Sequence, residues 1–117
     1  IKEVISMSNA LIKKVCVPCR GGIPPLTTSE AKTFLLSTVG WELKEDAKKL
    51  HRSFKFDDFQ MALDFVQKVA AVAEQEDHHP DIEFGWGYAN ISVLTHKING
   101  LHENDFILAA KINLIQE

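Results

Sequence analysis

Several features that define common function classes are absent from this 117-residue chain. No apolar run approaches the ~18 residues that a membrane-spanning helix needs, so we expect no membrane partner. Lys and Arg number 13 against 16 Asp and Glu, and the resulting net charge of −3 disfavours direct contact with nucleic acid. The absence of a visible targeting signal and of a disulfide framework favours a cytoplasmic location.

Cysteine is also scarce: Cys16 and Cys19 form a single Cys-Val-Pro-Cys motif. A structural zinc site would need two further Cys or His ligands at short spacing, and none follow the motif. A thioredoxin-like redox pair would need a helix that begins at the motif, but residues 20–25 contain two glycines and two prolines. We therefore interpret the two thiols as incidental or packing residues.

The chain does have the composition of one globular domain. Hydrophobic residues make up 45% of it and charged residues 25%, which are average values. A chain of this length buries enough surface to form a core without disulfides or metals. The one break in composition is the Gly/Pro-rich loop, so we expect a lead-in segment with a Cys/Gly/Pro loop at residues 1–25, followed by a single domain at residues 26–117.

Hydrophobic periodicity and capping residues predict seven elements in the order α-β-β-α-β-β-α. A Thr-x-x-Glu capping box at Thr27–Glu30 begins a first helix over residues 28–38, and Asp57 as N-cap with Gln60 begins a second helix that ends near Glu76. The strands are expected at 41–43, 50–56, 82–86 and 89–95, and the last helix at 103–115. Such short connections favour hairpins, so the predicted fold class is α+β, a four-stranded antiparallel sheet with three helices packed on one face.

Polar side chains concentrate in the run Glu74–Asp81, where the second helix should end and the third strand should begin. His78 and His79 lie in this run, and His96 follows the fourth strand. The third and fourth strands run out and back, so the three histidines should meet at one edge of the sheet. Imidazole both gives and takes protons near neutral pH, which predicts a proton-transfer site with Asp105 as a supporting carboxylate.

Each of these residues also has a purely structural interpretation. A histidine such as His78 is favoured at a helix C-terminus by the helix dipole, and Asp105 is favoured in the same way in the first turn of the last helix. His51 and His102 are interpreted as surface residues without a special role. Three histidines also suggest a metal, but adjacent histidines project in divergent directions and match no usual ligand spacing, so we expect no metal site.

A set of spaced residues begins at this polar run and continues into the last helix. They are Glu74, Asp77, His78, His79 and Pro80, then Thr95, His96, Gly100, Leu101 and Asp105. In this register they resemble the signature of the pterin-4a-carbinolamine dehydratase family, which in vertebrates is also known as a dimerisation cofactor of a homeodomain transcription factor. The resemblance covers about residues 26–115. One departure is His102, which stands where the family usually has a Ser or Thr N-cap.

The resemblance implies a hydro-lyase that dehydrates 4a-hydroxytetrahydropterin to quinonoid dihydropterin in tetrahydrobiopterin recycling, without a metal or redox cofactor. By position, His78 and His96 match the family's two general acids, and His79 matches the histidine that binds and orients the pterin. The family's supporting carboxylates match Glu74 and Asp105, and its substrate-binding residues also match Pro80 and Trp41.

Two other functions stay open at this point. A non-catalytic dimerisation or adaptor module for a transcription factor has no need of the complete histidine set, so that set favours an intact enzyme. A second alternative is a sensor whose cleft holds a related pterin or folate. We expect a homodimer or homotetramer, because the exposed edge strands of such sheets commonly pair across a two-fold axis. Nothing in the sequence indicates a transcription-factor partner.

Overall fold

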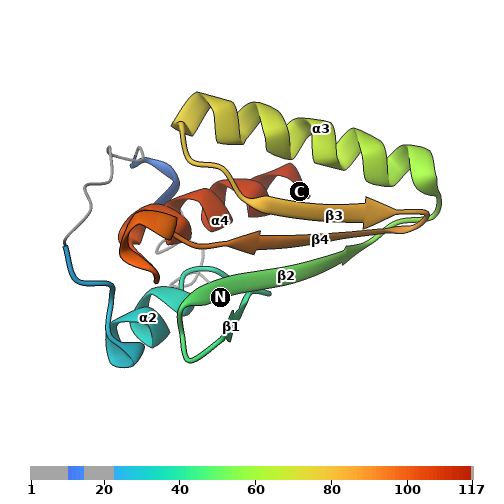
Figure 1. The fold of residues 1–117 in the computed structure, drawn as a ribbon. Helices are drawn as coiled ribbons and strands as arrows, with labels where there is room; N and C mark the ends of the chain where they lie inside the picture. The colour runs from blue at the N-terminus through green and yellow to red at the C-terminus, as the bar shows by residue number, and fades with distance from the viewer. Residues whose placement is uncertain (1–10, 15–22, 117) are drawn as a thin grey trace.

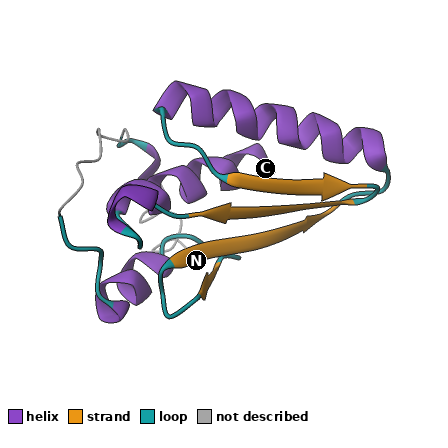
Figure 2. Ribbon diagram, in the orientation of Figure 1, coloured by secondary structure: helices purple, strands orange, loops and turns teal. Residues whose placement is uncertain are grey.

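The structure, a computed structural model, describes residues 11–14 and 23–116 (Figure 1). Cys16 and Cys19, and most of the expected lead-in, lie outside the described residues. Figure 2 shows the described chain as one layer of strands with helices packed against it. This arrangement confirms the predicted α+β class and its element order.

The order is helix, two strands, helix, two strands, helix. The elements are α2 (Thr28–Leu35), β1 (Glu42–Lys44), β2 (Lys49–Lys55), α3 (Phe59–Glu76), β3 (Asp81–Gly85), β4 (Tyr88–Val93), a short 3-10 turn η1 (His96–Ile98) and α4 (Glu103–Ile115). The predicted capping box of the first helix is present, since Thr27 and Glu30 each bond the other's backbone N–H. Helix α2 ends at Leu35, earlier than the predicted residue 38.

The N-cap predicted for the second helix was wrong by one residue. Oδ1 of Asp58, rather than a carboxylate oxygen of Asp57, accepts the backbone N–H of Met61 at 2.8 Å. Helix α3 ends at Glu76, as predicted. None of the helices in the described part of the chain combines the length and apolar character that crossing a bilayer requires.

The sheet is antiparallel throughout, in the order β1-β2-β4-β3. Two hairpins, β1–β2 and β3–β4, join along the central β2–β4 pair, where Phe54 lies opposite Ala89. Phe84 lies opposite Ala89 on the other side. Because side chains alternate across a strand, this register places one row of apolar residues on the same face of three strands.

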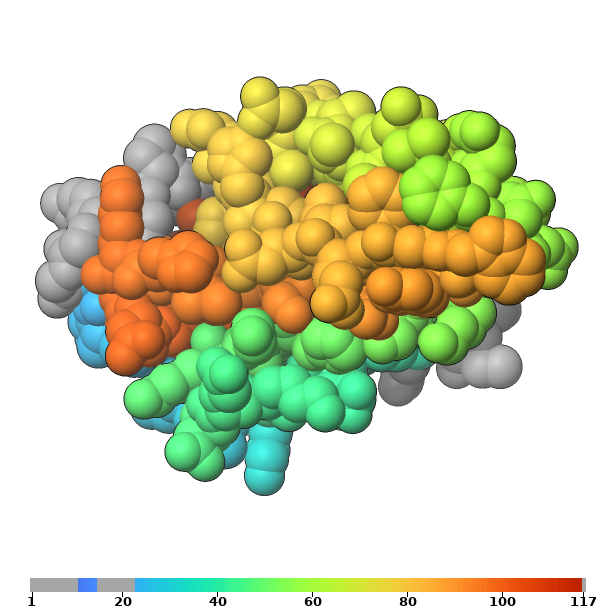
Figure 3. All heavy atoms as spheres, turned by 45° about the vertical axis from the view of Figure 1, so that its right-hand side comes forward, coloured from blue at the N-terminus to red at the C-terminus, as the bar shows by residue number. Residues whose placement is uncertain are grey.

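One face of the sheet is apolar and packs against the helices, and the other is polar. The buried strand residues all lie on the first face: Leu50, Phe54, Ala89, Ile91 and Val93. Helix α4 is buried along most of its length, which holds it firmly in the core. Figure 3 looks across the β3–β4 hairpin (orange), with α3 (yellow-green) above it and β1–β2 (green) below. The second face carries His51, Asp81, Glu83, Asn90 and Ser92, which line an open hollow.

Candidate active site

The end of α3 directs the predicted histidine pair. Asp77 is the C-cap and adopts a left-handed conformation, φ 52° and ψ 41°. Its backbone N–H bonds to carbonyls of the last helical turn, and the N–H of His78 reaches back to the carbonyl of Ala73 at 3.1 Å. Pro80 cannot continue a helix and disfavours helical backbone at His79. The chain therefore leaves the helix between Asp77 and β3, and the two imidazoles stand in this short connection.

His78 contacts the buried carboxylate of Asp105 directly. Its Nε2 lies 2.6 Å from Oδ1 of Asp105, and the two side chains are only 12% and 0% exposed. Nε2 of His78 donates to the carboxylate, because a carboxylate accepts hydrogen bonds. This assigns a proton to Nε2.

Asp105 is held by two further donors. Its Oδ2 accepts the hydroxyl of Thr95 at 2.8 Å and the backbone N–H of His102 at 2.9 Å. The second of these bonds is half of a capping box, because Nδ1 of His102 in turn accepts the N–H of Asn104. Asp105 therefore serves α4 as a capping residue and His78 as a hydrogen-bond acceptor at the same time.

His79 has a carboxylate partner of its own. Its Nε2 bonds to Glu74 on the last turn of α3, and both side chains are exposed. The structure thus brings together two histidine–carboxylate pairs from the set predicted by sequence. One pair is buried and one faces solvent.

His96 lies next to the buried pair along the chain. Thr95, the residue before it, bonds to Asp105 and also bridges to Gly100 across the 3-10 turn η1. His96 is the first residue of η1, and its side chain is exposed. His96 is therefore linked to the buried pair through the backbone of Thr95, and its side chain faces solvent.

Trp41 lies apart from the histidines. It is 5% exposed and its indole N–H donates to Oδ1 of Asn113 at 2.8 Å. Asn113 is two helical turns beyond Asp105 on α4, roughly 12 Å along the helix axis. The same amide oxygen accepts Nη1 of Arg52 at 2.5 Å, and burial lowers the pKa of the Arg52 guanidinium from its ordinary value. Trp41 therefore packs in the core here, and its part in substrate binding stays a prediction.

Two residues of the buried network were not predicted as site residues. Thr95 was noted as the end of a strand and as part of the family signature, without a role, and His102 was interpreted as a surface residue that stands at the family's N-cap position. The structure corrects the second view, since His102 is half-buried, caps α4 and donates its N–H to Asp105. The family register had placed His102 at the N-cap, and the reciprocal bonds with Asp105 show that it fills this position.

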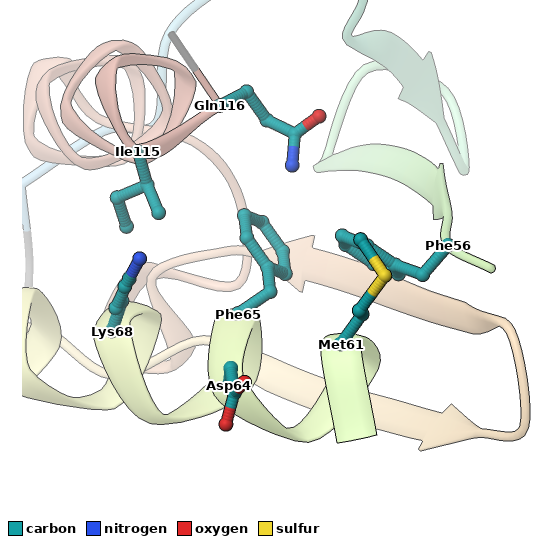
Figure 4. A pocket seen from close by; sticks show the side chains of 7 residues that line it. All are labelled: Phe56, Met61, Asp64, Phe65, Lys68, Ile115 and Gln116. Atoms are coloured by element: carbon teal, nitrogen blue, oxygen red, sulfur yellow. The ribbon is translucent and has the colours of Figure 1, made fainter. Parts of the chain in front are cut away.

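The hollow on the polar face of the sheet and the one in Figure 4 are not lined by His78, His79 or His96. Figure 4 shows one of about 230 Å³ where α3, the end of β2 and the end of α4 meet, with Phe56, Phe65 and Ile115 among its walls. None of its lining residues is a histidine. Over the described residues, no group of His, Cys, Asp and Glu has the geometry to hold a metal ion.

Comparison with known proteins decides the family. The model of the pterin 4 alpha carbinolamine dehydratase family matches residues 24–115. The chain belongs to this family. A relative from Methylococcus capsulatus that carries the family's name is 57% identical over 104 residues, which cover 89% of this chain and 91% of the relative. One from Rickettsia canadensis is 50% identical over 105 residues, which cover 89% and 95%.

Solved structures agree with this membership in the pterin-4a-carbinolamine dehydratase family. A transcriptional coactivator/pterin dehydratase from Brucella melitensis superposes with a TM-score of 0.74 at 35% identity, covering 80% of this chain and 99% of that one. A pterin dehydratase-like protein identified as a RuBisCO assembly factor superposes with a TM-score of 0.57 at 25% identity, covering 65% and 88%. The family and the names of the relatives support the enzyme class that the sequence predicts, a dehydratase.

Proposed function

We propose that this protein dehydrates 4a-hydroxytetrahydropterin to quinonoid dihydropterin by histidine general acid–base catalysis, and so acts in tetrahydrobiopterin recycling. The observation that carries the proposal is the bond between His78 and the fully buried Asp105. His79 directly follows His78, and His96 directly follows Thr95, which also bonds to Asp105. The match to the dehydratase family supplies the substrate class.

The reaction needs one proton delivered and one removed. The hydroxyl on C4a is a poor leaving group, and it leaves as water once an acid has protonated it. The C4a–O bond breaks while the N5 lone pair forms the N5–C4a double bond, and a base takes the N5 proton. One substrate gives one quinonoid dihydropterin and one water, and the acid and base exchange protons with solvent to reset.

The three histidines divide this work. His78 keeps its Nε2–H bonded to Asp105 and, with Nδ1 also protonated, gives the Nδ1 proton to the hydroxyl on one face of the pterin, and His96 serves the opposite face in the same way. His79, held by Glu74, binds and orients the ring, and Pro80 shapes the turn that carries the pair. Positioned acid–base catalysis of this kind accelerates a reaction by ~10²- to 10⁴-fold.

A stopped-flow absorbance assay with 4a-hydroxytetrahydropterin tests the proposal. We expect a His78→Ala/His96→Ala double variant to fall towards the uncatalysed rate and His79→Ala to lose activity mainly through a raised KM. His51→Ala is the matched control, because His51 lies on the uncovered face of the sheet and should leave the rate unchanged. Circular dichroism and gel filtration check that the variants keep their fold and size. A wild type no faster than the background reaction would refute the enzymatic proposal.

The His78→Ala/His96→Ala variant also separates the adaptor function from catalysis, when its partner binding is compared with that of the wild type. The Brucella melitensis relative is described as both a coactivator and a pterin dehydratase, so the fold is compatible with either role. A pure adaptor would bind its partner equally well with and without His78 and His96. We propose that the protein self-associates as a homodimer or homotetramer, which sedimentation of the wild type would measure.

A further inference from the structure

The segment 95–105 carries one proposed acid and the carboxylate that supports the other. Its course is set by a small bridge, in which the N–H of Thr95 bonds to the carbonyl of Gly100 at 2.9 Å and the return bond is 3.4 Å. Asn99 closes the turn in a left-handed conformation, φ 50°. A change in the position of Gly100 would therefore be passed to Thr95, and through the Thr95 hydroxyl to Asp105.

The chain just before α2 packs directly on this segment. The backbone N–H of Leu26 donates to the carbonyl of Leu101 at 2.8 Å. Pro25 lies so close to Gly100 that a Cβ added to Gly100 would stand 2.5 Å from the Pro25 Cβ and 3.2 Å from its Cγ. Gly100 thus lacks a side chain at the place where Pro25 comes closest, and the two residues are in van der Waals contact.

A second contact comes from residues 11–14. Leu11 is 5% exposed and belongs to the hydrophobic core, so this short stretch is anchored. Nζ of Lys14 lies 2.5 Å from the carboxylate of Glu103, the first residue of α4. Glu103 directly follows His102, whose N–H holds Asp105.

We propose that Leu11–Lys14 and Pro25–Leu26, together the N-terminal brace, position the segment 95–105 for catalysis. The residues of the brace are positioning residues, which act by holding Gly100, Leu101 and Glu103. The inference rests on the function proposed above. It gives residues of the lead-in a role in the reaction, although most of these residues precede the part of the chain that matches the family model.

The contact between Pro25 and Gly100 offers a steric test with an internal rescue. Gly100→Ala forces Pro25 and the segment apart, whereas Pro25→Gly removes both atoms that the new methyl group would meet. Gly100 has no left-handed φ, so alanine is compatible with its backbone. We expect Gly100→Ala to lower kcat by about 10- to 100-fold, the effect of a small misplacement of catalytic groups, with KM little changed. The Pro25→Gly/Gly100→Ala double variant should recover most of the loss.

Pro24→Gly is the matched control. Replacing the exposed Pro24 by glycine increases chain flexibility as Pro25→Gly does, but Pro24 is not among the residues nearest a Cβ at Gly100. The kcat of Pro24→Gly should therefore equal that of the wild type. For the second contact, Lys14→Met should lower kcat by at most about fivefold, because the pair is partly exposed, and its neighbour Lys13→Met should have no effect.

Nuclear magnetic resonance of the His78 ring gives a readout that a merely structural role would not change. The proton on Nε2 bonded to Asp105 should shift or broaden in Gly100→Ala and return in the double variant, while the urea midpoint reports stability separately. Gly100→Ala with wild-type kcat and an unchanged His78 signal would overturn the brace, as would a loss that Pro25→Gly fails to rescue. If the wild type does not dehydrate the pterin, the proposed function fails, and the His78 signal still decides whether the brace positions Asp105.

Discussion

Replacing Asp105 by asparagine is the most direct test of how the buried carboxylate controls His78. The carboxylate accepts three hydrogen bonds, from His78, from the Thr95 hydroxyl and from the N–H of His102. The oxygen of an asparagine of nearly the same size can keep the last two, but its NH₂ group then faces Nε2 of His78. His78 must accept at Nε2, so its proton moves to Nδ1 and the ring has the reversed tautomer.

The expected cost to stability is modest, and the expected cost to catalysis is large. All three hydrogen bonds can be kept, but each changes from a charge-assisted bond to a neutral one, while the cost of burying the charge is removed. Such bonds contribute about 1.5–3 and 0.5–1.5 kcal/mol respectively, so Asp105→Asn should lose roughly 1–2 kcal/mol of unfolding free energy. Asp105→Ala leaves three partners unpaired and should lose about 3–5 kcal/mol. Asparagine also lacks the negative charge that stabilises His78 with protons on both ring nitrogens, the form that gives a proton from Nδ1, so kcat should fall by ~10²-fold or more.

Three measurements decide the outcome for Asp105→Asn: urea denaturation, the stopped-flow rate and the tautomer of His78 by ¹⁵N resonance. Asp64→Asn is the control, because Asp64 is an exposed residue of α3 that bonds only to Gln60 among the described residues. A variant with wild-type kcat and a reversed His78 tautomer would refute the role given to Asp105. A loss of 5 kcal/mol without a change of tautomer would show that the carboxylate acts mainly as a helix cap.

Further predictions concern the ends of the two long helices. His102→Ala should cost about 1 kcal/mol in urea denaturation because it removes the acceptor for the N–H of Asn104, and His102→Thr should restore it. Lys111→Met should cost about 1.5–3 kcal/mol because it removes the 2.6 Å charge-assisted bond to the 5%-exposed Glu76 carboxylate, whereas the Glu76→Leu/Lys111→Met double variant should recover most of this loss. Asp77→Gly should raise the free energy of unfolding by up to about 1 kcal/mol, because Asp77 has φ 52°, and an unchanged thermal midpoint would contradict this strain argument.

Local signals in the sequence were sufficient to predict the elements and their order. The Thr27 capping box, Pro80 and the alternation of β2 and β4 each act within a few residues, and all of them lie where the structure has them. The N-cap of α3, which is Asp58 rather than the predicted Asp57, shows the limit of such signals. Two adjacent aspartates fit the capping pattern almost equally well, and only the position of the helix start selects the one that reaches the N–H of Met61.

The backbone conformation of the turn between β1 and β2 was outside the reach of pattern reasoning. Glu45, Asp46 and Ala47 all have positive φ, between 53° and 62°, although the turn contains no glycine or asparagine. Such residues rarely adopt this conformation by preference, so the surrounding hairpin must impose it. Ala47 is buried, which indicates that core packing helps to hold the turn.

Contacts across the fold were predictable only where the strand order or the family pattern supplied them. The resemblance included His78 and Asp105 in one site, but the pattern is silent on the Thr95 hydroxyl and on the pair between Glu76 and Lys111. Both contacts depend on how α3 and α4 pack on the sheet, and single-residue preferences carry no information on that packing. Glu76 lies two residues before His78, so its ion pair with Lys111 also ties the end of α3 to the helix that carries Asp105.

The proposed site is built almost wholly from the ends of helices. Asp77 ends α3 and turns the histidine pair out of it, and Asp105 belongs to the capping box that begins α4. Helix ends leave backbone groups unpaired, so polar side chains gather there for structural reasons. In this protein the same side chains then orient His78. Stability of the α4 start and the protonation geometry of the site are therefore coupled, and a variant that loosens the His102 cap should affect both in proportion.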